Sequence, residues 1–324
     1  MKTSTHFSPR DLWNRAWALS PALTVTTLLL VLGTAVTLAL LVLDPRQLLG
    51  EPVWLKPAKF YVSFVVFVVT LLYFFSFVPE RRRLLRVMGG ILSTCIGLEM
   101  LIVSIQAARG VRSHFNVATP FDRFIFMSMG ALIVVVWCTV FVFSLVLLRA
   151  KLADRVLAST LRMGLFVTLV GMGLGFLMTQ PRATQLESLQ AGAQPVELGS
   201  HSFGGNDGSP GLPIVGWSRT AGDMRPAHFI GLHALQVLPL FALGLARRKQ
   251  RSQSRDLARV RSAGVAYLGL TLTLMVQALR GQSIVSWDEV GLSSLGLVAL
   301  ASLVPLVLHA ARRGEDTSPR AVTL

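Results

Sequence analysis

Eight long apolar runs, each close to the length that crosses a bilayer, constrain this chain more than any other feature. A helix needs about 20 apolar residues to span a hydrocarbon core of about 30 Å. Hydrophobic residues make up 52% of the 324 residues and charged residues only 15%, a balance foreign to soluble domains. The sequence therefore predicts an all-α, polytopic membrane helix bundle. Its eight transmembrane helices are expected at 22–43, 60–78, 87–108, 124–148, 163–180, 228–246, 263–280 and 289–311.

Connections rich in lysine and arginine alternate with connections that are poor in them, and this alternation predicts the orientation. With the N-terminus inside, 21 of the 31 basic residues fall in inner segments. These segments are 1–21, 79–86, 149–162, 247–262 and 312–324. We expect an N-in/C-in protein of the bacterial cytoplasmic (inner) membrane. The net charge of +15 then reflects topology and attraction to the lipid bilayer, and no nucleic-acid partner is expected.

A single integral membrane domain, 1–324, is the simplest division, because the inner loops are too short to hold a core of their own. The exception in length is the exterior loop 181–227, whose centre at 203–211 is rich in turn-forming residues. Loops of this length commonly act as lids or are disordered. We expect a partly ordered lid, with disorder as the alternative.

Local signals mark helix ends and helix contacts. Thr119 followed by Pro120 is typical of a helix start, and Pro226 gives the same signal for the sixth helix. In the fifth helix, Gly171-x-Gly173-x-Gly175 is the small-residue spacing that lets membrane helices approach closely. No strand precedes these glycines, so a phosphate-binding loop is not expected.

Glu99 is the sharpest chemical signal, because it lies in the middle of the third apolar run. An acid near the bilayer centre costs at least ~2.5–3.5 kcal/mol, so it must face the bundle interior, be protonated or have a partner. Gln106 is expected on the same face, with Arg109 one turn further. A carboxyl that bonds a neighbouring helix and a functional acid both remain open.

Two histidines open the sixth helix. His228 and His233 are about 140° apart around the helix axis, and Gln236 falls between them. This spacing does not suit a two-histidine zinc clamp. With His114 from another segment, His228 and His233 remain candidate metal ligands, and haem b or a divalent metal is the candidate cofactor. Hydrogen-bonded interior histidines are the alternative.

The polar residues gather in the expected outer half, whereas the inner half offers little beyond His309. We therefore expect a site open to the exterior between the third, fourth, sixth and seventh helices, under the long loop. Its candidate catalytic residues are Glu99, His228 and His233. Its candidate ligand-binding residues are Gln106, Arg109, His114, Asn116, Trp217, Asp223, Arg225, Gln236, Gln277 and Arg280.

Known catalytic signatures such as G-x-S-x-G and H-E-x-x-H are missing. The segment EPVWLKPAKF at 51–60, with segments 106–122 and 211–236, resembles those of uncharacterised bacterial multi-pass integral membrane proteins. The resemblance implies a membrane protein and no activity, cofactor or catalytic residue. The residues favour a membrane enzyme or a haem- or metal-binding protein acting on an exterior or lipid-borne substrate. A ligand-binding sensor or a transporter without chemistry is the alternative, and the small-molecule or lipid ligand is unknown.

Overall fold

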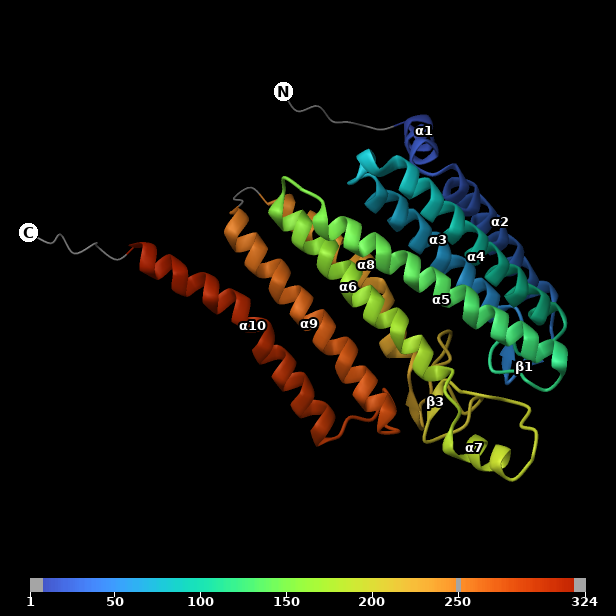
Figure 1. Cartoon of the computed structure of the whole chain (residues 1–324). Helices are drawn as coiled ribbons and strands as arrows, with labels where there is room; N and C mark the ends of the chain where they lie inside the picture. The colour runs from blue at the N-terminus through green and yellow to red at the C-terminus, as the bar shows by residue number, and fades with distance from the viewer. Residues whose placement is uncertain (1–7, 249–251, 318–324) are drawn as a thin grey trace, which may run out of the picture. The chain divides into compact units, whose positions relative to one another are not determined.

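The computed structural model describes residues 8–248 and 252–317, with side chains described as far as Arg312. Within this part of the chain, 8 helices are long and apolar enough to cross a membrane, which confirms the eight predicted runs (Figure 1). The chain is a multi-pass, all-α membrane protein. These helices are α2 Pro21–Leu43, α3 Leu55–Phe75, α4 Arg82–Ala108, α5 Pro120–Arg149, α6 Arg155–Met178, α8 Arg225–Ala246, α9 Gln253–Leu279 and α10 Glu289–Thr317.

Several helices extend beyond the apolar runs into polar flanks. α9 starts at Gln253 instead of 263, because the polar residues before its apolar core still favour helix. The predicted start of α5 is confirmed, since the Thr119 side chain accepts a hydrogen bond from the Asp122 N–H. Pro226 lies in the first turn of α8, also as predicted.

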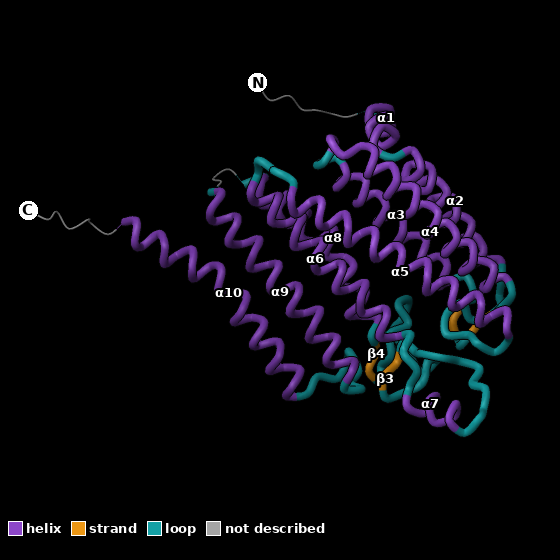
Figure 2. The backbone as a smooth tube through the Cα atoms, viewed as in Figure 1, coloured by secondary structure: helices purple, strands orange, loops and turns teal. Residues whose placement is uncertain are grey.

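The helices divide into two compact units. Unit 1 comprises Met1–Ala150 with Thr179–Ser200, and unit 2 comprises Lys151–Met178 with His201–Leu324. Each unit holds four of the long helices. The long loop is therefore shared between the units, and both the single domain and the lid stay predictions. The short elements are α1 Pro9–Leu19, β1 Gln47–Leu48, β2 Glu51–Pro52, η1 Pro79–Arg81 and α7 Ala183–Gln190 in unit 1, and β3 Ser202–Phe203 and β4 Gly222–Asp223 in unit 2 (Figure 2).

In unit 1, α4 packs against α2, α3 and α5. The rings of Phe75 on α3 and Phe143 on α5 are fully buried, with centroids 4.9 Å apart. The Tyr61 hydroxyl on α3 lies 3.1 Å from the Ser104 hydroxyl on α4. The hydroxyl contact joins α4, the helix that carries Glu99, to α3, and the ring contact joins α3 to α5.

In unit 2, α6 and α8 approach closely where two glycines meet. A Cβ added at Gly171 would lie 2.5 Å from the backbone of Gly231, so neither position has room for a side chain. Gly175 lies on the same side and faces His228, whereas Gly173 faces open space. The predicted role of the glycine pattern is thus confirmed for Gly171 and Gly175. α9 joins this pair through the Tyr267 hydroxyl, which donates to the Ile230 carbonyl at 2.8 Å, and α10 packs on α9.

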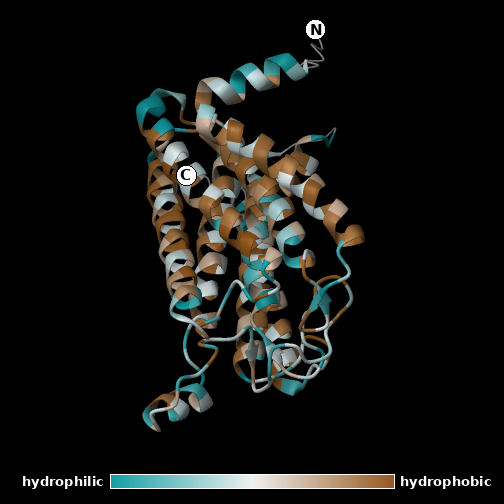
Figure 3. Ribbon diagram, turned by 90° about the vertical axis from the view of Figure 1, so that its right-hand side faces the viewer, coloured by the Kyte–Doolittle hydropathy of each residue, from teal (hydrophilic) through white to brown (hydrophobic). Residues whose placement is uncertain are grey.

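Hydrophobic residues follow one another along the long helices, as Figure 3 shows by colour, and many of their side chains are exposed. Only 17% of the apolar window of α2 and 6% of that of α10 is buried. A helix that is apolar on its exposed faces is stable in hydrocarbon and not in water. This pattern supports the membrane assignment independently of helix length.

Candidate functional site

Glu99 lies on α4 and is 1% exposed, so the expectation that it faces the bundle interior is confirmed. Neither carboxyl oxygen has a hydrogen-bond partner among the residues that the structure describes. Nε2 of His114 lies 3.9 Å from Oε1. A buried acid without a donor is costly, so this arrangement marks a place where a proton or a ligand is expected.

His114 lies in the loop between α4 and α5 and faces three kinds of group. Its Nδ1 is 3.0 Å from Nζ of Lys56 at the start of α3 and 3.0 Å from the Ser113 hydroxyl. Its ring lies edge-on to Phe60, with centroids 5.8 Å apart. A lysine ammonium only donates, so Nδ1 accepts from Lys56. In the neutral ring the proton is then on Nε2, which faces Glu99.

The loop that carries His114 is held by part of the long loop. Phe115 has a positive φ of 65°, which is uncommon for a residue with a side chain, and it is 2% exposed. Its carbonyl accepts from the Leu198 N–H at 2.9 Å, and Val117 donates to the Val196 carbonyl. An ion pair between Arg112 and Glu197 adds to this pairing. Residues 196–198 thereby position the histidine within unit 1.

A second cluster in unit 1 centres on Asp122. Its Oδ1 accepts from Arg109 at 2.7 Å and from Gln106 Nε2 at 3.1 Å, and Thr119 donates to its Oδ2 at 2.8 Å. Arg109 also donates to the side-chain oxygen of Gln106. Two of the predicted ligand-binding residues, Gln106 and Arg109, therefore bind a carboxylate that joins the end of α4 to the start of α5. The Asn116 side chain stabilises the loop in which it lies, because its oxygen accepts a hydrogen bond from the Ala118 N–H at 3.1 Å.

The α8 histidines of unit 2 have different surroundings. His228 Nδ1 lies 2.7 Å from the Gly171 carbonyl on α6, so it donates to that carbonyl and joins the two helices at their close contact. His233 is partly buried, bonds to Gln236 and lies edge-on to Phe229 at 4.3 Å. These contacts match the hydrogen-bonded alternative of the sequence analysis more closely than a metal pair.

Asp223 and Arg225 tie the loop before α8 to the helix. The carboxylate accepts from Arg225 Nη2 at 2.6 Å and from the Ser218 N–H at 2.8 Å. Arg225 also donates to the Gly216 carbonyl at 2.6 Å. Trp217 packs near Phe229, with ring centroids 5.9 Å apart. The arrangement is a charge-neutral loop anchor.

Gln277 and Arg280 hold the connection between α9 and α10. Gln277 Nε2 donates to the carbonyls of Ser283 and Ser286 at 2.7 and 3.2 Å. Arg280 makes an ion pair with Asp288 at 2.5 Å. The Arg280 guanidinium, with the Gly291 N–H, lowers the pKa of the Asp288 carboxyl to about 2, and the carboxylate raises the pKa of Arg280. These side chains are engaged in local structure.

Within unit 1 the structure brings together Glu99 and His114, and separately Gln106 and Arg109. The convergence predicted for the residues of both units stays a prediction. Across the described side chains, no three His, Cys, Asp or Glu groups could hold a metal ion. Lys56 and Asp122 were not predicted as site residues, because a lysine at the start of an apolar run and an aspartate just after a Thr-Pro helix start are ordinary features of a membrane helix end. Lys56 is 58 residues from His114, and nothing in the sequence signals that they meet.

The chain matches no protein-family model, no curated protein and no solved structure.

Proposed function

We propose that this protein is a membrane enzyme in which Glu99 and His114 exchange protons with an exterior or lipid-borne substrate. The observation that carries the proposal is the buried Glu99 carboxyl, which has no hydrogen-bond donor in the described part of the chain and lies 3.9 Å from His114 Nε2. Carboxyl and imidazole groups are the usual general acids and bases of enzymes.

Two of the three groups, Lys56 and His114, are partly exposed and the third, Glu99, is buried, which suits a proton relay. Lys56 is partly exposed, the His114 side chain is 22% exposed and Glu99 is 1% exposed. Lys56 fixes the tautomer of His114, and the Nε2–H of His114 is directed at Glu99. In the proposed mechanism Glu99 accepts a proton from the substrate or returns one to it. His114 orients the carboxyl and restores its protonation state.

A transporter or sensor without chemistry is the second candidate. The step from a partly exposed histidine to a buried acid favours it as well, because a proton that reaches a buried acid through a histidine can be coupled to movement of a ligand. The two candidates differ in whether the ligand leaves chemically changed.

The proposed setting is the bacterial inner membrane, with both termini in the cytoplasm. This orientation is supported by the distribution of lysine and arginine, because 21 of the 31 basic residues lie in segments that it places inside. The Lys56–His114–Glu99 cluster would then be reached from the extracytoplasmic side.

The proposal is tested by mass spectrometry of lipids and small molecules in membranes that contain the wild-type protein, E99Q or E80Q. Glu80 lies exposed in η1 and makes E80Q a matched control for the loss of one carboxylate. We expect a new product with the wild type and E80Q and at least a 100-fold smaller amount with E99Q, as for removal of a general acid or base.

Identical compounds in all three membranes would refute the enzyme. An unmodified compound that accumulates on one side of the membrane only with wild type and E80Q would favour the transporter.

A further inference from the structure

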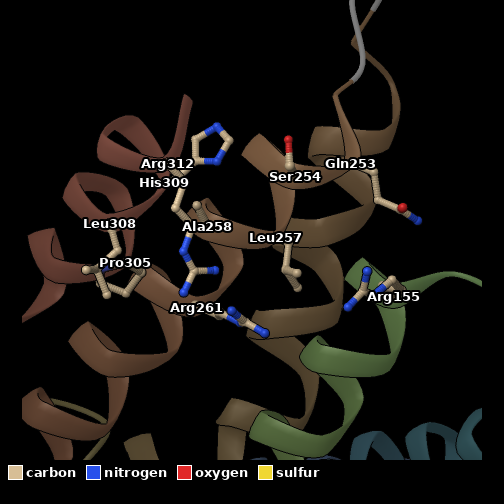
Figure 4. A pocket seen from close by; sticks show the side chains of 10 residues that line it. All are labelled: Arg155, Gln253, Ser254, Leu257, Ala258, Arg261, Pro305, Leu308, His309 and Arg312. Carbon is tan, nitrogen blue, oxygen red and sulfur yellow. The ribbon is translucent and has the colours of Figure 1, made fainter. Parts of the chain in front are cut away.

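A separate cavity lies at one end of unit 2, where α6 and α9 begin and α10 approaches its end. Its volume is about 500 Å³. Figure 4 shows side chains reaching it from these three helices. The polar residues that line it are Arg155, Gln253, Ser254, Arg261, His309 and Arg312.

The charge of this cavity is uncompensated. Arg155, Arg261 and Arg312 come from three different helices, and its lining includes no acidic residue. In the described part of the chain none of these three arginines makes an ion pair. By contrast Arg259, which lies on α9 like Arg261, pairs with Asp256. Three cations gathered without a counterion repel one another unless an anion joins them.

The donors fit a phosphate in particular. Guanidinium groups bind phosphate oxygens with two parallel hydrogen bonds, and Gln253 and Ser254 add neutral donors. Nε2 of His309 is buried and has no hydrogen-bond partner among the described residues. It supplies a further polar atom next to the arginines.

The position of the cavity suits a lipid headgroup. Leu257, Pro305 and Leu308 give it an apolar wall, and α10 has only 6% of its apolar window buried. Basic pockets between the ends of membrane helices are known sites for anionic headgroups. We propose that this cavity binds a phosphate-bearing anion through Arg155, Arg261 and Arg312. The phosphate group belongs either to an anionic phospholipid or to a soluble phosphorylated compound.

The test measures displacement of a fluorescent phosphatidylglycerol from the purified full-length protein, with phosphatidylcholine as the neutral competitor. Arg255 lies on the first turn of α9, outside the cavity lining, so R255Q removes the same charge nearby. We expect saturable binding by the wild type and R255Q, and binding at least tenfold weaker in R261Q and in R155Q. R261K should recover part of the loss, because the charge returns without the bidentate geometry.

Inorganic pyrophosphate distinguishes the two sources. Competition by pyrophosphate would support a soluble phosphorylated ligand, and its failure to compete while phosphatidylglycerol binds would support a headgroup. Equal affinity in R155Q, R261Q and R255Q, or equal binding of phosphatidylcholine, would overturn the proposal. Unchanged thermal unfolding of the lipid-free variants verifies that each is folded.

Discussion

Replacement of Gly171 by alanine should loosen the contact between α6 and α8. The added Cβ would lie 2.5 Å from the Gly231 carbonyl carbon and 2.6 Å from the Leu232 nitrogen. Both are backbone atoms, so no side chain can turn aside, and the helices must separate by about 1 Å to restore ordinary contact. The Gly171 carbonyl also accepts from His228 at 2.7 Å, and the same movement lengthens that bond.

The expected cost is about 2–3 kcal/mol of unfolding free energy, which combines overpacking with a weakened hydrogen bond. Gly173→Ala is the matched control, because its Cβ would meet nothing within 4 Å. Both variants gain the same helix propensity, so their difference isolates the contact. The difference in unfolding free energy between the two variants is measured by unfolding in mixed micelles with increasing dodecyl sulfate. Equal stability of G171A and G173A would show that the two helices do not pack as described.

Two further outcomes are expected. The folded-state pKa of Asp288, about 2, lies below its ordinary value of 3.8. The contribution of its ion pair with Arg280 is therefore complete above about pH 4 and lost as the pH falls towards 2. The stability difference between the wild type and D288N should shrink over that interval, and a constant difference would argue against the pair. For the proposed orientation, an impermeant maleimide should label Asn206→Cys but not Arg83→Cys in intact cells, in a background without native cysteines; labelling of Arg83→Cys would reverse the topology.

The membrane helices could be predicted because each apolar run carries its signal within about 20 consecutive residues. The two short helices were missed for the opposite reason. α1 has only 11 residues, and its Trp13 and Trp17 stack on each other while remaining exposed. α7 has 8 residues and lies in a loop whose composition suggested turns. Neither has a long apolar face that would distinguish it from a connection.

The candidate site shows the same division between local and long-range information. The burial of Glu99 followed from its position in an apolar run, since a lipid-facing carboxyl is unfavourable there. The partners of Lys56 and Asp122 did not follow, because each contact joins segments that only the fold brings together. Gly231 was overlooked as well, since a single glycine has no spacing pattern to mark it.

Proton exchange at Glu99 is the central claim, and infrared difference spectroscopy against pH tests it most directly. Spectra of the wild type in lipid should contain a pH-dependent carbonyl band of a protonated, buried carboxyl. The band should be absent in E99Q, retained in E80Q and shifted in H114Q, because the group opposite the carboxyl has changed. An E99Q spectrum indistinguishable from that of the wild type would contradict the account, since Glu99 would then keep one protonation state throughout.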